Sequence, residues 1–181
     1  MNAGTYSMSP IREEHLEQLL EWRNSETIRS KMITDHLITM EEHRNWFKQK
    51  EKQATPLHFV FEYKGKPVGY IGYTDRDPAS GICSSGLYIG DHEGLPPTSG
   101  FAIEFLMLEY AFERLDVRKL WAGVFSFNRK VIQLHELFGF QHEGLLKAHV
   151  LKNGQYEDFT LMAIFSGDWA EKRSRFYRYF K

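Results

Sequence analysis

The chain has 181 residues, of which 42% are hydrophobic and 15% aromatic, enough to build the core of one domain. Its 23 basic and 24 acidic residues give a net charge of -1, so the sequence offers no electrostatic footprint for nucleic acid and no reason to expect an acidic partner. The single cysteine, Cys83, excludes an intrachain disulfide and indicates a buried strand thiol in a reducing compartment.

The sequence shows no targeting or membrane-spanning pattern. The N-terminus lacks the charged and then apolar order of a signal peptide, and the longest apolar stretch, around Phe101–Phe112, is too short to cross a bilayer. No repeat or flexible linker divides the chain. We therefore expect one cytoplasmic domain over residues 1–181, with no membrane partner and a polar and aromatic tail over 168–181.

The first half of the chain predicts helices between a first strand and a three-stranded meander. Apolar spacing and turn signals place a strand over Tyr6–Ile11, helices over Arg12–Trp22 and Asn24–Met32, a helix from the Thr39 capping box through Glu51, and strands over Leu57–Tyr63, Pro67–Thr74 and Ile82–Gly90.

The second half alternates helices and strands. An irregular loop over Asp91–Ser99 precedes a helix over Phe101–Leu115, a strand over Lys119–Phe125, a helix over Asn128–Phe138, a hairpin of Phe140–Leu151 and Tyr156–Phe165 about the type I′ signal Asn153-Gly154, and a surface helix over Asp168–Lys181. This order predicts an α/β fold (α+β in some schemes), with a mixed, mostly antiparallel sheet and helices on both faces.

The most promising place for chemistry is the strand end at Leu87–Asp91 and the helix that begins near Gly100. Ligands gather where strand ends meet helix N-termini, and such a terminus suits a pyrophosphate. Asn128 is a natural N-cap for the later helix. Many α/β proteins have such junctions for structural reasons alone, so that interpretation stays open.

Several motifs together resemble the GNAT acetyltransferases, over nearly the whole chain. Within that superfamily the sequence is most similar to PseH-type enzymes, which N-acetylate the 4-amino group of a UDP-linked 4-amino-4,6-dideoxy-L-altrose derivative in the pseudaminic acid pathway. The segments concerned are Trp22-Arg23-Asn24, Thr34-Asp35-His36, Glu42–Phe47, Lys66–Gly69, Leu87–Asp91, Leu108–Glu113, Phe127-Asn128, Phe138-Gly139-Phe140 and Glu143-Gly144.

The resemblance implies acetyl-CoA as co-substrate, no metal, and a central strand pair that splays apart. Pantetheine would enter the gap between Leu87–Gly90 and Lys119–Phe125 and pair with the backbone of Leu87 and Ile89. The cofactor-binding residues it implies are Leu87, Tyr88, Ile89, Leu95, Thr98, Ser99, Gly100 and Asn128.

The expected pyrophosphate loop departs from the family pattern. Where the family has a basic residue and a glycine, this chain has Leu95 and Thr98, and two prolines remove two N–H donors. Gly100 remains, and the hydroxyls of Thr98 and Ser99 could add donors. We expect weaker CoA binding than the usual loop gives, or a rearranged loop.

The resemblance also suggests how the reaction would run. His135 stands where many members have a tyrosine that protonates the leaving thiolate, and an imidazole can serve the same role. The alternative is a half-buried histidine beside Phe138. An N–H of Ile89 or Gly90 would hold the oxyanion, a base that the sequence does not identify would deprotonate the amine, and transfer would be direct.

The N-terminal helices and the meander would form the acceptor side. Arg23 and His43 are candidates for the diphosphate, and by resemblance Thr74 lies near the nucleotide, while Met32 and His36 could line the sugar pocket. Each has a structural alternative: Arg23 could pair with Glu26, His43 could be solvated, and Met32 could belong to the core.

Two rivals remain. A transferase for protein N-termini or another small amine would need an acidic acceptor groove, and an inactive GNAT-fold binding module would explain the altered loop.

In the C-terminal tail, Arg173, Arg175 and Arg178 alternate with aromatic residues. We expect this segment to pack on the domain or to contact a homodimer partner rather than RNA or a membrane.

Overall fold

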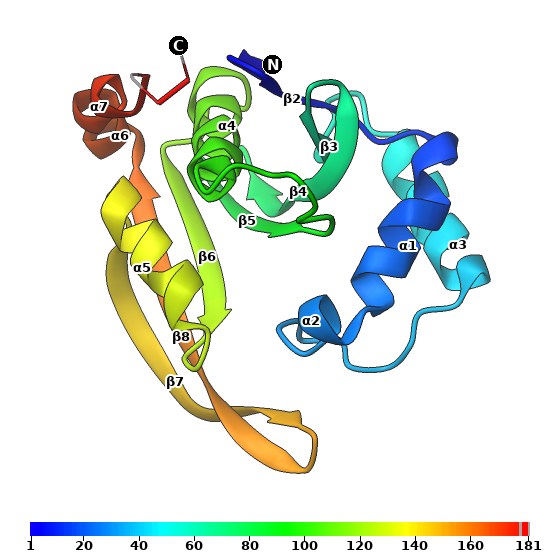
Figure 1. Ribbon diagram of the computed structural model, residues 1–181. Helices are drawn as coiled ribbons and strands as arrows, with labels where there is room; N and C mark the ends of the chain where they lie inside the picture. The colour runs from blue at the N-terminus through cyan, green and yellow to red at the C-terminus, as the bar shows by residue number, and fades with distance from the viewer. Residues whose placement is uncertain (178, 181) are drawn as a thin grey trace.

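A twisted mixed sheet forms the centre of the computed structural model, which describes residues 1–177, 179 and 180 (Figure 1). Among these residues eight strands pair in the order β1-β2-β3-β4-β5-β6-β8-β7. Every neighbouring pair is antiparallel except β5 and β6, which are parallel. The strands are β1 (Asn2–Ala3), β2 (Tyr6–Pro10), β3 (His58–Tyr63), β4 (Lys66–Asp77), β5 (Ile82–Ile89), β6 (Lys119–Phe125), β7 (Gln141–Lys152) and β8 (Gln155–Phe165).

Helices cover both faces of this sheet, which confirms the α/β class expected from the sequence. Trp22 and Leu19 of α1 pack with Val60 on one face, whereas α4 and α5 belong to the main core on the other. Figure 1 shows α1, α2 and α3 grouped together, away from α4 and α5. The helices are a 3-10 turn (Glu13–His15), α1 (Leu16–Asn24), α2 (Glu26–Arg29), α3 (Met40–Glu51), α4 (Ser99–Glu113), α5 (Arg129–Phe138), α6 (Ser166–Lys172) and α7 (Ser174–Tyr177).

Local chemistry explains where several elements begin and end. At the start of α3 the Thr39 hydroxyl accepts from the Glu42 N–H at 3.2 Å, and the Glu42 carboxylate accepts from the Thr39 N–H at 2.7 Å, as the capping box predicted. Asn153 and Gly154 have φ of 49° and 79°, which suits the predicted type I′ turn. The extended backbone of Ser25, with ψ of 142°, ends α1 and leaves α2 a single turn, shorter than expected.

The C-terminal tail is more buried than the sequence suggested. Trp169 is 1% exposed and Phe176 6%, and the Phe176 ring stacks on Phe138 with centroids 4.0 Å apart. Glu109 of α4 accepts from the Trp169 indole at 2.9 Å. The tail forms two short helices, α6 and α7, instead of one, and the expectation that it packs on the domain is confirmed for the described part, outside which Arg178 lies.

The two central strands separate halfway along their length. β5 and β6 pair through three registers, Ile82 with Lys119, Cys83 with Leu120 and Ser84 with Trp121. Beyond Ser84 each strand continues without pairing to the other, because β5 follows β4 and β6 follows β8. The expected splayed strand pair is present, and it opens one edge of each strand.

Candidate active site

A cavity of about 700 Å³ occupies the opening between β5 and β6 and extends beneath α1, α2 and α3. It brings together residues predicted from distant parts of the sequence. From the cofactor and catalytic set its wall includes Leu87, Tyr88, Ile89, Gly100, Asn128 and His135, and from the acceptor set Arg23, Met32, His36 and His43. It does not include Gly90, Leu95, Thr98, Ser99 or Thr74 among the described residues that line it.

The strand register decides which backbone groups face the opening. The N–H of Gly90, the residue after β5, donates to the Val68 carbonyl at 2.8 Å, so Gly90 and, within β5, Tyr88 and Gly86 are the residues that bond to β4. Leu87 and Ile89 alternate with them and direct their backbone groups toward β6, where no strand pairs. Ile89 can therefore offer a free N–H to an oxyanion, but the expectation that Gly90 could do so was wrong.

Gly90 has a steric role instead. A Cβ at this position would lie 2.2 Å from the Trp22 ring, so only glycine lets the indole lie against the strand. Trp22 is 7% exposed and anchors α1 over the strand end. The family resemblance rests partly on the Trp22-Arg23 segment. In this structure Trp22 serves to pack α1 against the end of the strand.

The loop before α4 is tight, and its polar side chains are occupied. Ser99 is 3% exposed, and both its N–H and its hydroxyl donate to the Pro96 carbonyl, at 3.0 and 2.7 Å. Its hydroxyl oxygen also lies 3.0 Å from that of Tyr6, and the Thr98 hydroxyl lies 3.4 Å from the same tyrosine. Leu95 packs against the main core.

The expectation that Ser99 adds a hydroxyl donor for pyrophosphate is therefore wrong in this conformation. The N–H groups of Gly100 and Phe101, in the first turn of α4, have no partner among the described residues. These donors and the helix dipole are what the loop offers to an anion.

Asn128 leaves its side chain available. It precedes α5, but its side chain makes no capping hydrogen bond, contrary to the predicted N-cap role. The amide lines the cavity instead. Lys130, which the sequence interpretation did not include, lines the cavity from the next turn.

His135 is buried in a specific pair. It is 3% exposed, its Nδ1 lies 2.7 Å from Oε1 of Glu104, and its ring stacks on Phe140 with centroids 4.6 Å apart. Glu104 is fully buried. The expected alternative, a half-buried histidine beside Phe138, was wrong, because His135 is almost fully buried, is paired with Glu104 and also lines the cavity.

Arg23 and His43 present unpaired nitrogen atoms in the acceptor part of the cavity. Arg23 donates from Nη2 to the Thr34 carbonyl at 3.3 Å, while its buried Nη1 has no partner among the described residues. Glu26 pairs with Arg29 rather than with Arg23, so that alternative was wrong. His43 is 7% exposed, with Nε2 buried and equally unpartnered.

Burial governs the ionisation of these two groups. It lowers the pKa of Arg23, and it lowers the pKa of His43 with a further contribution from the Arg23 charge. His43 stacks on Trp46 with centroids 5.1 Å apart, which fixes its ring plane. Buried nitrogen atoms without partners, such as Nη1 of Arg23 and Nε2 of His43, are costly for the fold, and an anionic ligand would satisfy both.

The other predicted acceptor residues differ in position. His36 is exposed on the cavity rim, where its Nε2 lies 3.2 Å from Glu42. Met32 lines the wall and packs against the smaller hydrophobic cluster. Thr74 is exposed on β4 and its hydroxyl donates to Asp75 at 3.1 Å, so its place near a nucleotide stays a prediction.

A lysine from the far hairpin bonds to the segment that follows α2 and contributes Met32 to the cavity wall. Lys152, at the end of β7, donates to Asp35 at 2.7 Å and to the Met32 carbonyl at 2.9 Å, and is 4% exposed. Its hydrogen bonds lower the pKa of Asp35. This contact joins residues more than a hundred positions apart, so no local signal in the sequence could have identified it.

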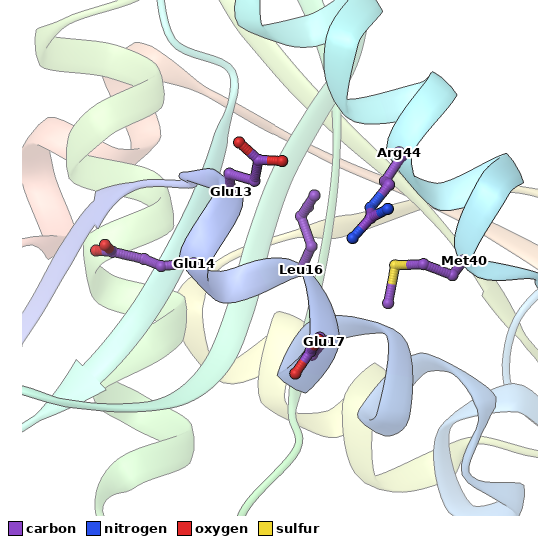
Figure 2. Close-up of a pocket in the computed structure, with 6 residues that line it drawn as sticks. All are labelled: Glu13, Glu14, Leu16, Glu17, Met40 and Arg44. Atoms are coloured by element: carbon purple, nitrogen blue, oxygen red, sulfur yellow. The ribbon is translucent and has the colours of Figure 1, made fainter.

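A smaller hollow of about 340 Å³ lies between the start of α1 and α3 (Figure 2). None of the predicted site residues lines it; its wall is Glu13, Glu14, Leu16, Glu17, Met40 and Arg44. Among the described residues no group of three or more His, Cys, Asp or Glu is placed to hold a metal ion. Within the described residues, no helix has the length and apolar character needed to cross a membrane.

Comparison with known proteins agrees with this geometry. The acetyltransferase (GNAT) domain family matches residues 7–141. Acetyltransferase PseH of Campylobacter jejuni (strain 81-176) is 29% identical over 133 residues, which cover 72% of this chain and 79% of that protein. Spermidine N(1)-acetyltransferase of Escherichia coli K12 is 24% identical over 169 residues, covering 91% and 88%.

Solved structures show the same fold. The crystal structure of spermidine N-acetyltransferase from Vibrio cholerae in complex with CoA and spermine aligns with a TM-score of 0.85 at 20% identity, over 92% of this chain and 98% of that one. The splayed strands, the helix N-terminus beside them and the family match lead to one conclusion. The chain belongs to the GNAT acetyltransferase family and is an N-acetyltransferase that uses acetyl-CoA.

Proposed function

We propose that the protein acetylates the 4-amino group of a nucleotide-linked amino sugar, as a PseH-type enzyme does in the pseudaminic acid pathway. The proposal rests on the charge of the acceptor part of the cavity. Arg23 and His43 each have a buried nitrogen without a partner there. A diphosphate would satisfy both nitrogens through charge-assisted hydrogen bonds.

The same observation weighs against a polyamine or another small cationic amine. A polyamine needs carboxylates, and among the described residues that line the cavity Glu42 is the one carboxylate. It is engaged by the Thr39 N–H and hydroxyl and by His36. The other ionisable lining groups are Arg23, Lys31, His36, His43, Tyr70, Tyr88, His92, Lys130 and His135.

Two named relatives support different acceptors. The PseH match favours the amino sugar, at 29% identity. The spermidine acetyltransferase similarity covers more of the chain at lower identity, so a small amine is the alternative. The charge of the cavity distinguishes the two acceptors. A cavity dominated by basic and imidazole groups attracts anions and repels polyamines.

In the proposed reaction the neutral amine attacks the thioester carbonyl directly. Cys83 is unsuited to a covalent intermediate, because it is fully buried and burial raises the pKa of its thiol to about 11. The Ile89 N–H would hold the oxyanion, and the amide of Asn128 would contact the pantetheine arm. His135 would protonate the departing CoA thiolate.

Initial-rate measurements of thiol release test the acceptor. The panel contains acetyl-CoA with a UDP-linked 4-amino sugar, the same amino sugar without nucleotide, spermidine, an aminoglycoside and a peptide with a free N-terminus. We expect kcat/KM to be highest for the UDP-linked sugar and to fall at least about tenfold when the nucleotide is removed.

Spermidine turnover above that of the nucleotide sugar would contradict the proposal and favour the small-amine alternative. Thermal unfolding with acetyl-CoA alone is the control for a working cofactor site. A rise in Tm with acetyl-CoA shows that the altered loop still binds CoA, so that inactivity toward one acceptor reflects acceptor choice.

A further inference from the structure

The pair of His135 and Glu104 is unusual in being almost completely removed from water. His135 is 3% exposed and Glu104 is 0% exposed, and Nδ1 and Oε1 lie 2.7 Å apart. The second carboxylate oxygen of Glu104 is buried and has no partner among the described residues. The hydrogen bond to His135 is therefore the polar contact that the structure gives this carboxyl group.

The pair also has a defined orientation. Glu104 lies within the strongly apolar helix α4 and approaches the ring from the core, while stacking on Phe140 fixes the ring plane. Since Nδ1 faces Glu104, Nε2 is the nitrogen left for the cavity, and no described residue hydrogen-bonds to it. The same cavity wall contains Leu87 and Ile89, whose backbone edges face the open side of β5.

A carboxylate without a partner is unfavourable in such a place, and the ring of His135 supplies the hydrogen bond that this carboxylate makes to the described residues. We propose that Glu104 is a positioning residue, which accepts the Nδ1–H of His135 and directs the Nε2 proton of the ring toward the CoA sulfur. This inference rests on the acid role of His135 in the proposed function. It explains how a histidine can replace a tyrosine acid at this position.

The proton balance is as follows. When the tetrahedral intermediate collapses, the C–S bond breaks and its electron pair goes to sulfur, which takes the Nε2 proton to give the CoA thiol. The imidazole left behind is neutral and still donates its Nδ1–H to Glu104. The proton lost by the amine passes to water, and water returns one proton to Nε2 after the products leave.

Other charged groups near the ring do not supply this effect. Glu136, on the same helix, bonds to His142 of β7 at 2.7 Å on the exposed side. Lys172 of α6 lies beside Gly139, past the end of α5. Glu104 of α4 is the acidic group that contacts the ring, so its removal changes the charge there most directly.

Glu104→Gln tests the inference, with Glu109→Gln as its matched control. Glu109 is also on α4 and is 7% exposed, but it bonds to Trp169 and Arg173 in the core. We expect Glu104→Gln to lower kcat about 10²-fold near pH 8 with the Kd for acetyl-CoA unchanged. Glu109→Gln should lose stability but keep the wild-type kcat.

A second readout does not depend on the acceptor. In ¹⁵N NMR of the free protein we expect the wild-type His135 ring to carry a proton on Nδ1 that is hydrogen-bonded to Glu104, and this single arrangement to be lost in Glu104→Gln. A wild-type ring without a proton on Nδ1, or an unchanged kcat in Glu104→Gln, would overturn the inference. If the nucleotide sugar proves to be the wrong acceptor, the NMR result and the kcat effect with the true amine remain, so the two failures are distinguishable.

Discussion

Replacing Arg23 by methionine should change stability and acceptor binding in opposite directions. The guanidinium lines the cavity with a buried Nη1 that has no partner, and burial lowers its pKa. Methionine keeps most of the aliphatic volume and removes the unpaired donor. The fold should tolerate this change, whereas a phosphate-bearing acceptor should lose a contact.

The magnitudes follow from the contacts. An unpaired buried donor costs about 1–3 kcal/mol, and the single hydrogen bond that is lost, to the Thr34 carbonyl at 3.3 Å, contributes about 1 kcal/mol. The free energy of unfolding should therefore stay unchanged or rise by up to about 2 kcal/mol, and each kcal/mol corresponds to about 2–4 °C in Tm for a chain of this size. A charge-assisted bond to phosphate contributes about 1.5–3 kcal/mol, so the acceptor KM should rise about 10- to 150-fold.

Thermal unfolding and initial rates on the same preparation measure both effects. Arg44→Met is the control, because Arg44 is exposed on α3 and lines only the smaller hollow (Figure 2). It should leave the acceptor KM unchanged. A marked loss of stability in Arg23→Met with an unchanged KM would refute the reasoning and make Arg23 a structural residue.

Three further predictions concern packing, pH and thiol reactivity. Gly90→Ala should lower the free energy of unfolding by about 1–3 kcal/mol, measured in urea, because its Cβ meets the Trp22 ring, whereas Gly86→Ala, with open space around it, should not. Burial lowers the pKa of His58 to about 4, so the folded state binds fewer protons than the unfolded state and stability should fall by up to about 3 kcal/mol from pH 6.5 to 4. His58→Gln should flatten that slope, and an unchanged slope would exclude His58 as its cause. Cys83 should resist a thiol reagent in the native protein and react once the chain is unfolded; rapid native labelling would contradict its burial.

Most of the fold could be predicted because its elements have strong local signals. The capping box at Thr39 and the Asn153-Gly154 turn act over a few residues, and both are present as expected. The tail was expected to pack, but its sequence could not show where, because the hydrophobic surface that buries Trp169 and Phe176 comes from α4 and α5.

The site could be predicted less well, because it depends on register and on distant partners. Leu87 lies on β5 and Gly90 directly follows it, yet only the pairing with β4 decides which of their backbone groups are free. Glu104 was missed, although a carboxylate within an apolar helix is itself a signal of a buried partner. Lys152 has no such signal, since its contact with Asp35 exists only after the hairpin and the loop before α3 meet.

A competition experiment tests the central claim most directly. The protein receives limiting acetyl-CoA with equimolar UDP-linked 4-amino sugar and spermidine, and mass spectrometry measures which amine has gained the acetyl group. The account predicts that acetylated nucleotide sugar predominates and that Arg23→Met shifts the ratio toward spermidine. Preferential acetylation of spermidine by the wild-type protein would contradict it.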